Sequence, residues 1–263
     1  LSSGNVITGN RWGLVMNMAS YPDEASAGYI PTAGNINSDG IRVYGGSLGT
    51  TATWYDVGAD FILTSSGAVG SSGDLEIRPG VTVKFDNAIQ LTVAGNLDIA
   101  GTPVDGVLLT ERAPEDEWSG LEFQGGSSGT LQYCTIEYVT RYSGNAIYAN
   151  GTLPNLEHCT LRYNDYGLYV RNVVNPTLSV TNVIADNNTV GLYITGCTNP
   201  SISNQTITGH DTDYGAIYMA STGSFHLGGG NTITGNRWGL VMNMGSYPDE
   251  ASMGNIPTAG NIN

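Results

Sequence analysis

The sequence has little positive charge and few cysteines. Its 263 residues include 9 Lys and Arg against 23 Asp and Glu, a formal net charge of −14, and Lys84 is the only lysine. So acidic a chain repels phosphate backbones and anionic membrane surfaces, which argues against nucleic acid as a partner. The three cysteines are odd in number and too few for a disulfide-stapled scaffold.

Long hydrophobic runs are also missing. No stretch approaches the ~18 apolar residues of a membrane span, so we expect no membrane insertion in this segment. Only 12% of the residues are charged, and 37 glycines with abundant Asn, Ser, Thr and Tyr argue against a coiled coil or helical bundle. Hydrophobic residues make up 40% of the chain and recur throughout, which is enough to bury a core. The composition indicates an all-β protein.

The two ends of the sequence are nearly the same segment. Residues 4–37 recur at 230–263 with an offset of 226, and only four of the 34 aligned positions differ, namely Val6/Thr232, Ala19/Gly245, Ala27/Met253 and Tyr29/Asn255. We therefore interpret 1–37 as the C-terminal end of a preceding repeat unit and 38–263 as one full unit. Because the second copy stops inside a unit, we expect a parent polypeptide with more copies.

A shorter period lies within the unit. From about residue 130, a Thr-Ile-like strand, an Asn- or Asp-rich turn, a glycine and a second strand follow one another repeatedly. The positions after the glycine recur about every 23 residues, at Ile147, Leu168, Leu192, Ile217 and Leu240. Short strands at about this spacing without intervening helices predict a parallel β-solenoid of about 23 residues per coil, with roughly ten coils per unit.

Strand alternation predicts which side chains face inward. In the strands after the glycines, residues such as Leu168 and Val170 fill the core, so the residues between them point outward. This places a stripe of tyrosines on four consecutive rungs: Tyr148, Tyr169, Tyr193 and Tyr218. An exposed stripe of aromatic rings can stack on glycans or pack against a neighbouring filament, or it can simply stabilise the rungs beneath it.

The other strand carries a second inward row. We expect Ile136, Leu161, Ile184, Ile207 and Ile233 to point into the core. The residues two positions earlier share that face and should form an internal ladder of thiols and amides: Cys134, Cys159, Asn182, Gln205 and Asn231. We predict buried free thiols for the two cysteines, with a disulfide between rungs as the alternative.

Several stretches resemble a known family. The run LEIRPGVTVKF with LTVAGNLDIAGT, the segments WSGLEF and SSGTLQYCTIEY, and the Asn-rich coils ending in GLYV resemble right-handed parallel β-helix repeats of bacterial secreted and surface proteins. The resemblance covers roughly residues 38–244. It implies a right-handed single-stranded parallel β-helix, but this architecture serves adhesins, lyases, glycoside hydrolases, tailspikes and passive stalks alike.

An enzyme would need converging acids, and the best candidates lie in the turns around GHDTDYG. Asp211 and Asp213 flank this turn, and Asp165 and Asp186 lie in the equivalent turns of the two preceding coils. Such carboxylates could cleave glycosides or bind calcium, although Asp in a turn usually bonds the local backbone. The motifs of the related hydrolases are not matched, because Asp rather than Gly follows His210. We therefore predict no catalytic residues and no cofactor, with calcium as the weak alternative.

Two insertions interrupt the coil rhythm, and we expect both to project as acidic loops. Loops on a rigid scaffold often carry recognition. Their acids could bind calcium or a basic partner, or could simply be solvated. They are Glu111, Glu115, Asp116 and Glu117 in the first loop, and Asp23 with Glu24, repeated as Asp249 with Glu250, in the second.

Taken together, the sequence predicts a non-enzymatic extracellular repeat unit of a surface fibre, stalk or adhesin. Its expected partners are copies of itself in tandem or head to tail, and also neighbouring filaments or glycans. The alternative is a β-helix that binds or degrades polysaccharides, with the tyrosine stripe and the turn acids forming its groove.

Overall fold

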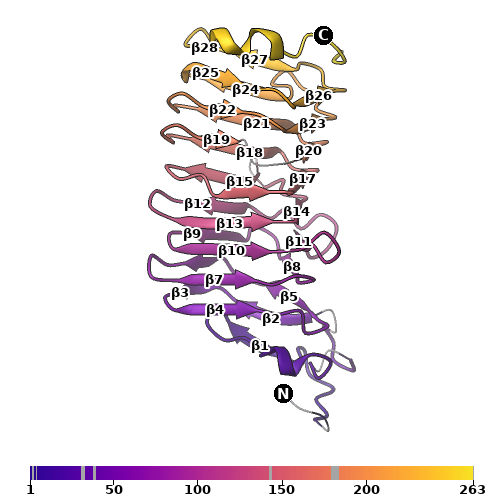
Figure 1. Ribbon diagram of the computed structural model, residues 1–263. Helices are drawn as coiled ribbons and strands as arrows, with labels where there is room; N and C mark the ends of the chain where they lie inside the picture. The colour runs from indigo at the N-terminus through magenta and orange to yellow at the C-terminus, as the bar shows by residue number, and fades with distance from the viewer. Residues whose placement is uncertain are drawn as a thin grey trace.

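The computed structural model describes residues 1, 3, 5–30, 33–37, 40–141, 144–178 and 184–262. The chain winds upward as a stack of coils, with the N-terminal residues at one end and the C-terminal residues at the other (Figure 1). Each regular coil contributes one strand to each of three faces, and every strand pairing between coils is parallel. The predicted all-β parallel solenoid is confirmed.

Face 1 is a ten-stranded parallel sheet that runs the whole length of the stack. Its strands, from the N-terminal end, are β1 (Val15–Asn17), β2 (Gly40–Tyr44), β5 (Asp60–Leu63), β8 (Thr82–Phe85), β11 (Val107–Glu111), β14 (Cys134–Glu137), β17 (Thr160–Arg162), β20 (Ile184–Asp186), β23 (Thr206–Thr208) and β26 (Thr232–Thr234).

Face 2 follows face 1 along each coil and is a nine-stranded sheet. Its strands are β3 (Gly46–Leu48), β6 (Gly67–Val69), β9 (Gln90–Val93), β12 (Gly120–Phe123), β15 (Asn145–Asn150), β18 (Tyr166–Arg171), β21 (Val190–Thr195), β24 (Ile217–Ala220) and β27 (Leu240–Met242).

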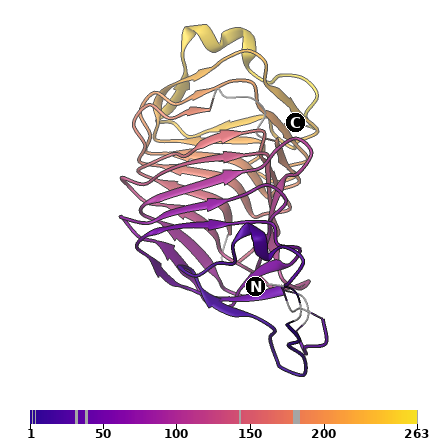
Figure 2. The same ribbon diagram turned by 60° about the horizontal axis from the view of Figure 1, so that its bottom comes forward.

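Face 3 completes the coil in two stretches, a five-stranded sheet followed by a four-stranded one. The strands are β4 (Thr51–Trp54), β7 (Asp74–Ile77), β10 (Asn96–Ala100), β13 (Ser128–Gln132) and β16 (Asn155–Glu157), then β19 (Thr177–Leu178), β22 (Ser201–Ile202), β25 (Gly223–Leu227) and β28 (Ser246–Pro248). The helical elements among the described residues are two short 3-10 turns, η1 (Glu24–Ser26) near the N-terminus and η2 (Glu250–Asn255) at the other end of the stack (Figures 1 and 2).

The register fixes the coil size. On face 1, nine buried residues align from rung to rung: Ile41, Phe61, Val83, Leu109, Ile136, Leu161, Ala185, Ile207 and Ile233. The chain climbs from Ile41 to Ile233 in eight steps, so that each coil takes about 24 residues on average. The unit therefore has about nine coils, slightly fewer and longer than the coils that the sequence predicts.

The core is a continuous column of apolar side chains inside the three faces. On face 2 the inward row includes Leu121, Ile147 and Leu168, each fully buried. Large aromatic rings stack within the core, with Phe85 and Trp118 at a centroid distance of 4.0 Å. Such a pair contributes about 0.5–1.5 kcal/mol beyond the burial of its surface.

A ladder of four asparagines and one histidine, all buried except the half-buried Asn261, lines the corner that follows face 1. In successive coils this corner holds Asn164, Asn188, His210, Asn236 and Asn261. The Oδ1 atom of Asn188 accepts hydrogen bonds from the backbone N and the Nδ2 of Asn164, both at 2.9 Å, and its Nδ2 donates to the carbonyl oxygen of Leu161 at 2.8 Å. Each amide thus ties its own coil to the one before it and satisfies backbone groups that no water reaches.

The ladder also explains one error in the predicted core. The sequence predicts Ile184 at the inward position of its rung, but the register aligns Ala185 with Leu161 and Ile207, and Ala185 is buried. In each of these coils the inward residue lies three positions before the ladder residue, as Leu161 does before Asn164. Because Asn188 must align with Asn164, the rung position falls to Ala185 although isoleucine is more apolar.

The predicted inner ladder of thiols and amides is present where the structure describes it. The Sγ atoms of Cys134 and Cys159 lie 3.3 Å apart, and all three cysteines, Cys197 included, are buried and free. Further along the same row, the backbone N of Gln205 donates to the Oδ1 of Asn231 at 3.0 Å. Asn182 lies outside the described residues.

Replacing Asn188 by alanine tests the amide ladder. The variant leaves the Leu161 carbonyl without its donor and two nitrogens of Asn164 without their acceptor, all in a buried corner. We expect the free energy of unfolding to fall by about 2–4 kcal/mol in chemical denaturation. The control, exposed Asn155→Ala on face 3, should cost about 0.5 kcal/mol or less. Equal losses in the two variants would contradict a structural role for the ladder.

Candidate functional site

The predicted tyrosine stripe lies on face 2. The register pairs Tyr148 with Tyr169, Tyr169 with Tyr193, and Tyr193 with Tyr218, and all four side chains are half-buried. Alternation along β15, β18, β21 and β24 turns them outward, because their neighbours Ile147, Leu168, Leu192 and Ile217 fill the core. The stripe ends at Glu122 and Val241, the outward residues of the rungs on either side.

Two further tyrosines enlarge the stripe into a cluster of six. Tyr166 lies 5.9 Å from Tyr169 and 5.7 Å from Tyr193, and Tyr214 lies 5.3 Å from Tyr218, measured between ring centroids. Neither belongs to the stripe that the sequence predicts. The sequence signal that could have revealed them is the dipeptide Tyr-Gly. It occurs at 166–167 and 214–215, shortly before the core residues Leu168 and Ile217.

The rings of this tyrosine cluster pack on one another. Successive rungs bring the centroids to 5.1, 4.7 and 4.8 Å, and the last pair, Tyr193 with Tyr218, is stacked at an interplanar angle of 21°. Ring faces that contact a neighbouring ring are not free to stack on a sugar. The cluster instead offers ring edges and phenol hydroxyl groups to whatever lies against face 2.

Burial also changes the acidity of the cluster. Desolvation is the main cause that raises the pKa of Tyr166, Tyr169 and Tyr193 above the ordinary 10.0, and neighbouring phenols add to it. All three hydroxyl groups therefore stay protonated, and able to donate hydrogen bonds, throughout the physiological range.

Three of the four candidate acids bond to groups of adjacent coils. The Oδ2 of Asp165 accepts from the backbone N of Gly144 at 3.0 Å, and the Oδ1 of Asp186 accepts from the Thr208 hydroxyl at 2.9 Å. Asp213 forms an ion pair with Arg237 at 3.1 Å, and Asp211 is exposed. Each of these three partners lies in a neighbouring coil, so the carboxylates of Asp165, Asp186 and Asp213 connect successive coils.

His210, which the sequence places beside these acids, is fully buried and belongs to the amide ladder. Its Nδ1 lies 2.8 Å from the carbonyl oxygen of Asn188, and its Nε2 lies 3.1 Å from that of Ala185. Burial lowers the pKa of His210 below 6.5 and outweighs these two contacts, which act in the opposite direction. The histidine therefore replaces an asparagine rung and does not reach solvent.

The first acidic loop follows β11. Within it, Asp116 holds the turn through contacts with both the carbonyl oxygen and the backbone N of Ala113, and Glu117 pairs with Arg141 at 3.5 Å. Glu115 is exposed, while Glu111 is half-buried, and its pKa is raised by desolvation and by the charge of Asp116. The adjacent Arg112 pairs with Asp86 at 3.1 Å.

The second acidic loop does not project as predicted. In both copies the aspartate precedes a short 3-10 turn and accepts from a serine hydroxyl at 2.6 Å, Asp23 from Ser26 and Asp249 from Ser252. Asp249 also caps its turn by accepting from the backbone N of Ser252 at 2.9 Å. The Ser252 hydroxyl in turn accepts from the backbone N of Leu227 at 2.7 Å, which holds the loop against β25. Glu24 and Glu250 stay exposed. The loop stays part of the last coil because the Ser252 hydroxyl accepts the hydrogen bond that a backbone carbonyl oxygen would accept in a regular strand pairing.

Within the described part of the chain, no three His, Cys, Asp or Glu side chains are grouped so that they could hold a metal ion. In the same residues, none of the helices has the length and apolar character that crossing a bilayer requires.

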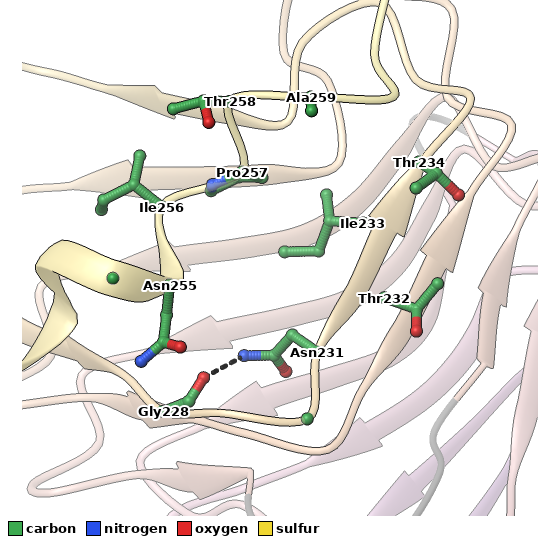
Figure 3. Close-up of a pocket in the computed structure, with 12 residues that line it drawn as sticks. Gly228, Asn231, Thr232, Ile233, Thr234, Asn255, Ile256, Pro257, Thr258 and Ala259 are labelled. Carbon is green, nitrogen blue, oxygen red and sulfur yellow. Dashed lines mark hydrogen bonds between the residues drawn. The ribbon is translucent and has the colours of Figure 1, made fainter.

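The C-terminal end of the stack carries a cleft of about 400 Å³. It lies between β26 and residues 254–259, which comprise the end of η2 and the segment after it (Figure 3). Ile233 points from β26 toward Ile256 and Pro257, whereas Thr232 and Thr234 point to the other side of the strand. The cleft is thus the open end of the core column.

Comparison with known proteins agrees with this architecture. Residues 143–249 match the family model described as a right handed beta helix region. No curated protein and no solved structure gives a significant match to the chain. This match covers about two fifths of the chain, and together with the coil topology it supports a right-handed parallel β-helix architecture.

Alkaline titration tests the tyrosine cluster. A phenol whose pKa is raised in the folded state stabilises the fold fully below pH 10.0, and this stabilisation is lost as the pH rises through the folded pKa. We expect tyrosinate absorbance to show a component that titrates above pH 10.0 and loses amplitude in Tyr169→Phe. The control, Tyr247→Phe, removes an exposed phenol on face 3 and should leave that component unchanged. A titration without such a component would contradict the packing of the cluster.

Acid titration tests His210. A histidine whose folded pKa lies below 6.5 stabilises the fold above pH 6.5, and this contribution is lost as the pH falls through the folded pKa. In His210→Asn the amide can donate to Ala185 as Asn236 donates to Ile207, and it does not titrate. We expect the loss of unfolding free energy between about pH 7 and pH 5 to be smaller in this variant. His158→Asn serves as control, and an equal reduction there would contradict the assignment.

Proposed function

We propose that the chain is a non-enzymatic structural repeat unit of a long extracellular fibre, stalk or adhesin on a cell surface. Main-chain ladders between coils run along the rod, and the core column continues from unit to unit. Joining units covers the open sheet edges at each end, which would otherwise pair with foreign strands. Repetition of one unit also multiplies weak lateral contacts into avidity.

The observation that carries this proposal is the behaviour of the duplicated segment. Its second copy forms the last coil of the stack, and strand β1 of its first copy pairs in parallel with β2. The same residues therefore serve as the end of one stack and the beginning of another. A self-contained domain needs capping segments at its ends, whereas a repeat unit needs ends that match.

Lengthening the chain by whole units tests the fibre. With about nine coils per unit and about 4.8 Å per coil, each added copy of residues 38–263 should lengthen a rod by about 45 Å in electron micrographs. The control is the unextended chain imaged under the same conditions. Isolated globular particles of unchanged length would contradict the proposal, and so would added copies that fold side by side.

A carbohydrate-binding or polysaccharide-degrading protein is the second candidate, favoured by the six phenol hydroxyl groups gathered on face 2. Incubation with neutral and acidic polysaccharides separates the two functions. Release of oligosaccharides would establish degradation and remove the non-enzymatic proposal, whereas retention on an immobilised glycan without cleavage would make the unit an adhesin.

A further inference from the structure

The two copies of the duplicated segment share several of the hydrogen bonds that hold their turns. In the first copy, the Nδ2 of Asn35 donates to the carbonyl oxygen of Ile7 at 2.9 Å, and in the second, Asn261 donates to Ile233 at 3.1 Å. The backbone bonds that join the neighbouring turns also recur, Gly9 to Gly34 and Gly235 to Gly260. The local structure therefore follows from the repeated sequence.

The copies differ in the face to which their strand belongs. In the second copy, Leu240–Met242 forms β27 and ends face 2, where Leu240 pairs with Ile217. In the first copy, the corresponding residues are 14–16, which overlap β1 at the start of face 1, where Val15, the counterpart of Val241, pairs with Arg42 of β2. The same segment therefore supplies the last strand of face 2 in one copy and the first strand of face 1 in the other.

Burial shows that the second copy lacks a cover that the first copy has. Trp12, Met16 and Met18 are 9%, 9% and 1% exposed, whereas the corresponding residues of the second copy are 40%, 44% and 105% exposed. The covering atoms come from the coils that follow, since Arg42 and Arg112 lie over the Trp12 ring and Met18 lies against Gly67 of β6. The exposed counterparts are Trp238, Met242 and Met244.

We propose that the C-terminal end of the unit is the docking surface for a following copy, and that the two are joined with an offset of one face. The strand that corresponds to β2 stacks on β27, so that face 2 of one unit continues as face 1 of the next. The residues corresponding to Arg42, Gly67 and Arg112 then cover Trp238 and Met244. This inference rests on the proposed function, because it takes the occupant to be another copy of the unit.

The length of the repeat supports the offset independently. Nine coils of about 24 residues fall about ten residues short of the offset of 226 between the copies. Such a remainder is close to one strand with its turn, which is a third of a coil. A period of nine and one third coils moves every feature to the neighbouring face in the next unit.

The offset determines where side chains recur along a rod. The tyrosine cluster and the acidic loops turn by one of three faces per unit and return to the same direction after three units. At about 45 Å per unit, that distance is about 135 Å. A rod built in this way presents the tyrosine cluster in three directions, so it can contact neighbours on every side.

Disulfide trapping within the chain tests the offset directly. Val15 and Arg42 point outward from β1 and β2 and are paired in the register, so Val15→Cys with Arg42→Cys should form a disulfide under mild oxidation. Without the offset, β1 would lie below β3, and Val15→Cys with Ser47→Cys would be the pair that forms. Peptide mapping identifies the bond, and the three native cysteines are buried. Trapping of the Ser47 pair instead of the Arg42 pair overturns the proposal.

Methionine oxidation tests the docking surface. In the unextended chain, we expect peroxide to oxidise Met244 roughly tenfold faster than Met18 or more, because oxidation follows exposure. In a chain extended by a second copy of residues 38–263, peroxide should oxidise Met244 as slowly as it oxidises Met18. Met253 is the internal control, because its counterpart Ala27 is exposed even where a coil follows. Rapid oxidation of Met244 in the extended chain would overturn the proposal.

The two tests separate this proposal from the fibre itself. If rods lengthen with each added unit but Met244 is still oxidised rapidly, the fibre proposal holds and the proposed offset junction is wrong. If the Arg42 pair is trapped and Met244 is protected, but assemblies never exceed the covalent chain, the junction stands and the head-to-tail route to a longer fibre falls.

Discussion

Every coil of this protein must place its backbone within hydrogen-bonding distance of the coil before it, and the rest of the structure depends on that constraint. Parallel ladders require corresponding residues to stack at about 4.8 Å, so all coils need nearly the same perimeter. The coils still differ in length, since the step from Ile41 to Phe61 on face 1 is shorter than the step from Leu109 to Ile136. Surplus residues leave the stack as turns, such as the one after β11 that carries Asp116.

The corner after face 1 shows how the constraint is enforced. A turn leaves backbone groups without partners, and inside a narrow coil water cannot supply them. Asn164, Asn188 and Asn236 each supply a donor and an acceptor to the preceding coil. An amide can do this without charge, which is why His210 is the exceptional member. Its ring reaches the same carbonyl oxygens, but protonation would bring a charge into the buried corner.

Much of the fold can be predicted because repetition averages out local ambiguity. The apolar alternation around Leu168, Leu192 and Ile217 recurs at one spacing, so it correctly predicts the inward and outward sides of face 2, and with them the register of four tyrosines. The prediction is wrong at Ala185, because the most apolar residue is not the one that the neighbouring amide places in the core. Tyr166 and Tyr214 escape the pattern because they lie before the core positions of their strands, outside the alternating stretch.

The acidic loops show a different limit. Asp23 and Asp249 are negative residues in a Gly- and Ser-containing segment, and such a segment is typical of a solvated projection. The structure uses Asp249 to cap a turn whose Ser252 replaces a missing strand partner of Leu227. A hydroxyl that accepts a hydrogen bond in place of a backbone carbonyl oxygen leaves no hydrophobic period, so the sequence pattern does not reveal it.

The duplicated segment shows that local sequence and position in the stack are determined separately. Thirty of its 34 positions are identical, and both copies make the same amide contacts, so the sequence specifies the coil. The face to which the strand belongs follows from the coil with which it pairs, which is β2 of the following coil for β1 and β24 of the preceding coil for β27. In a three-sided solenoid, a repeat length that is not a whole number of coils rotates each unit about the rod axis relative to the unit before it. The number of residues in the unit, and not any single side chain, then determines the directions in which the tyrosine cluster is displayed.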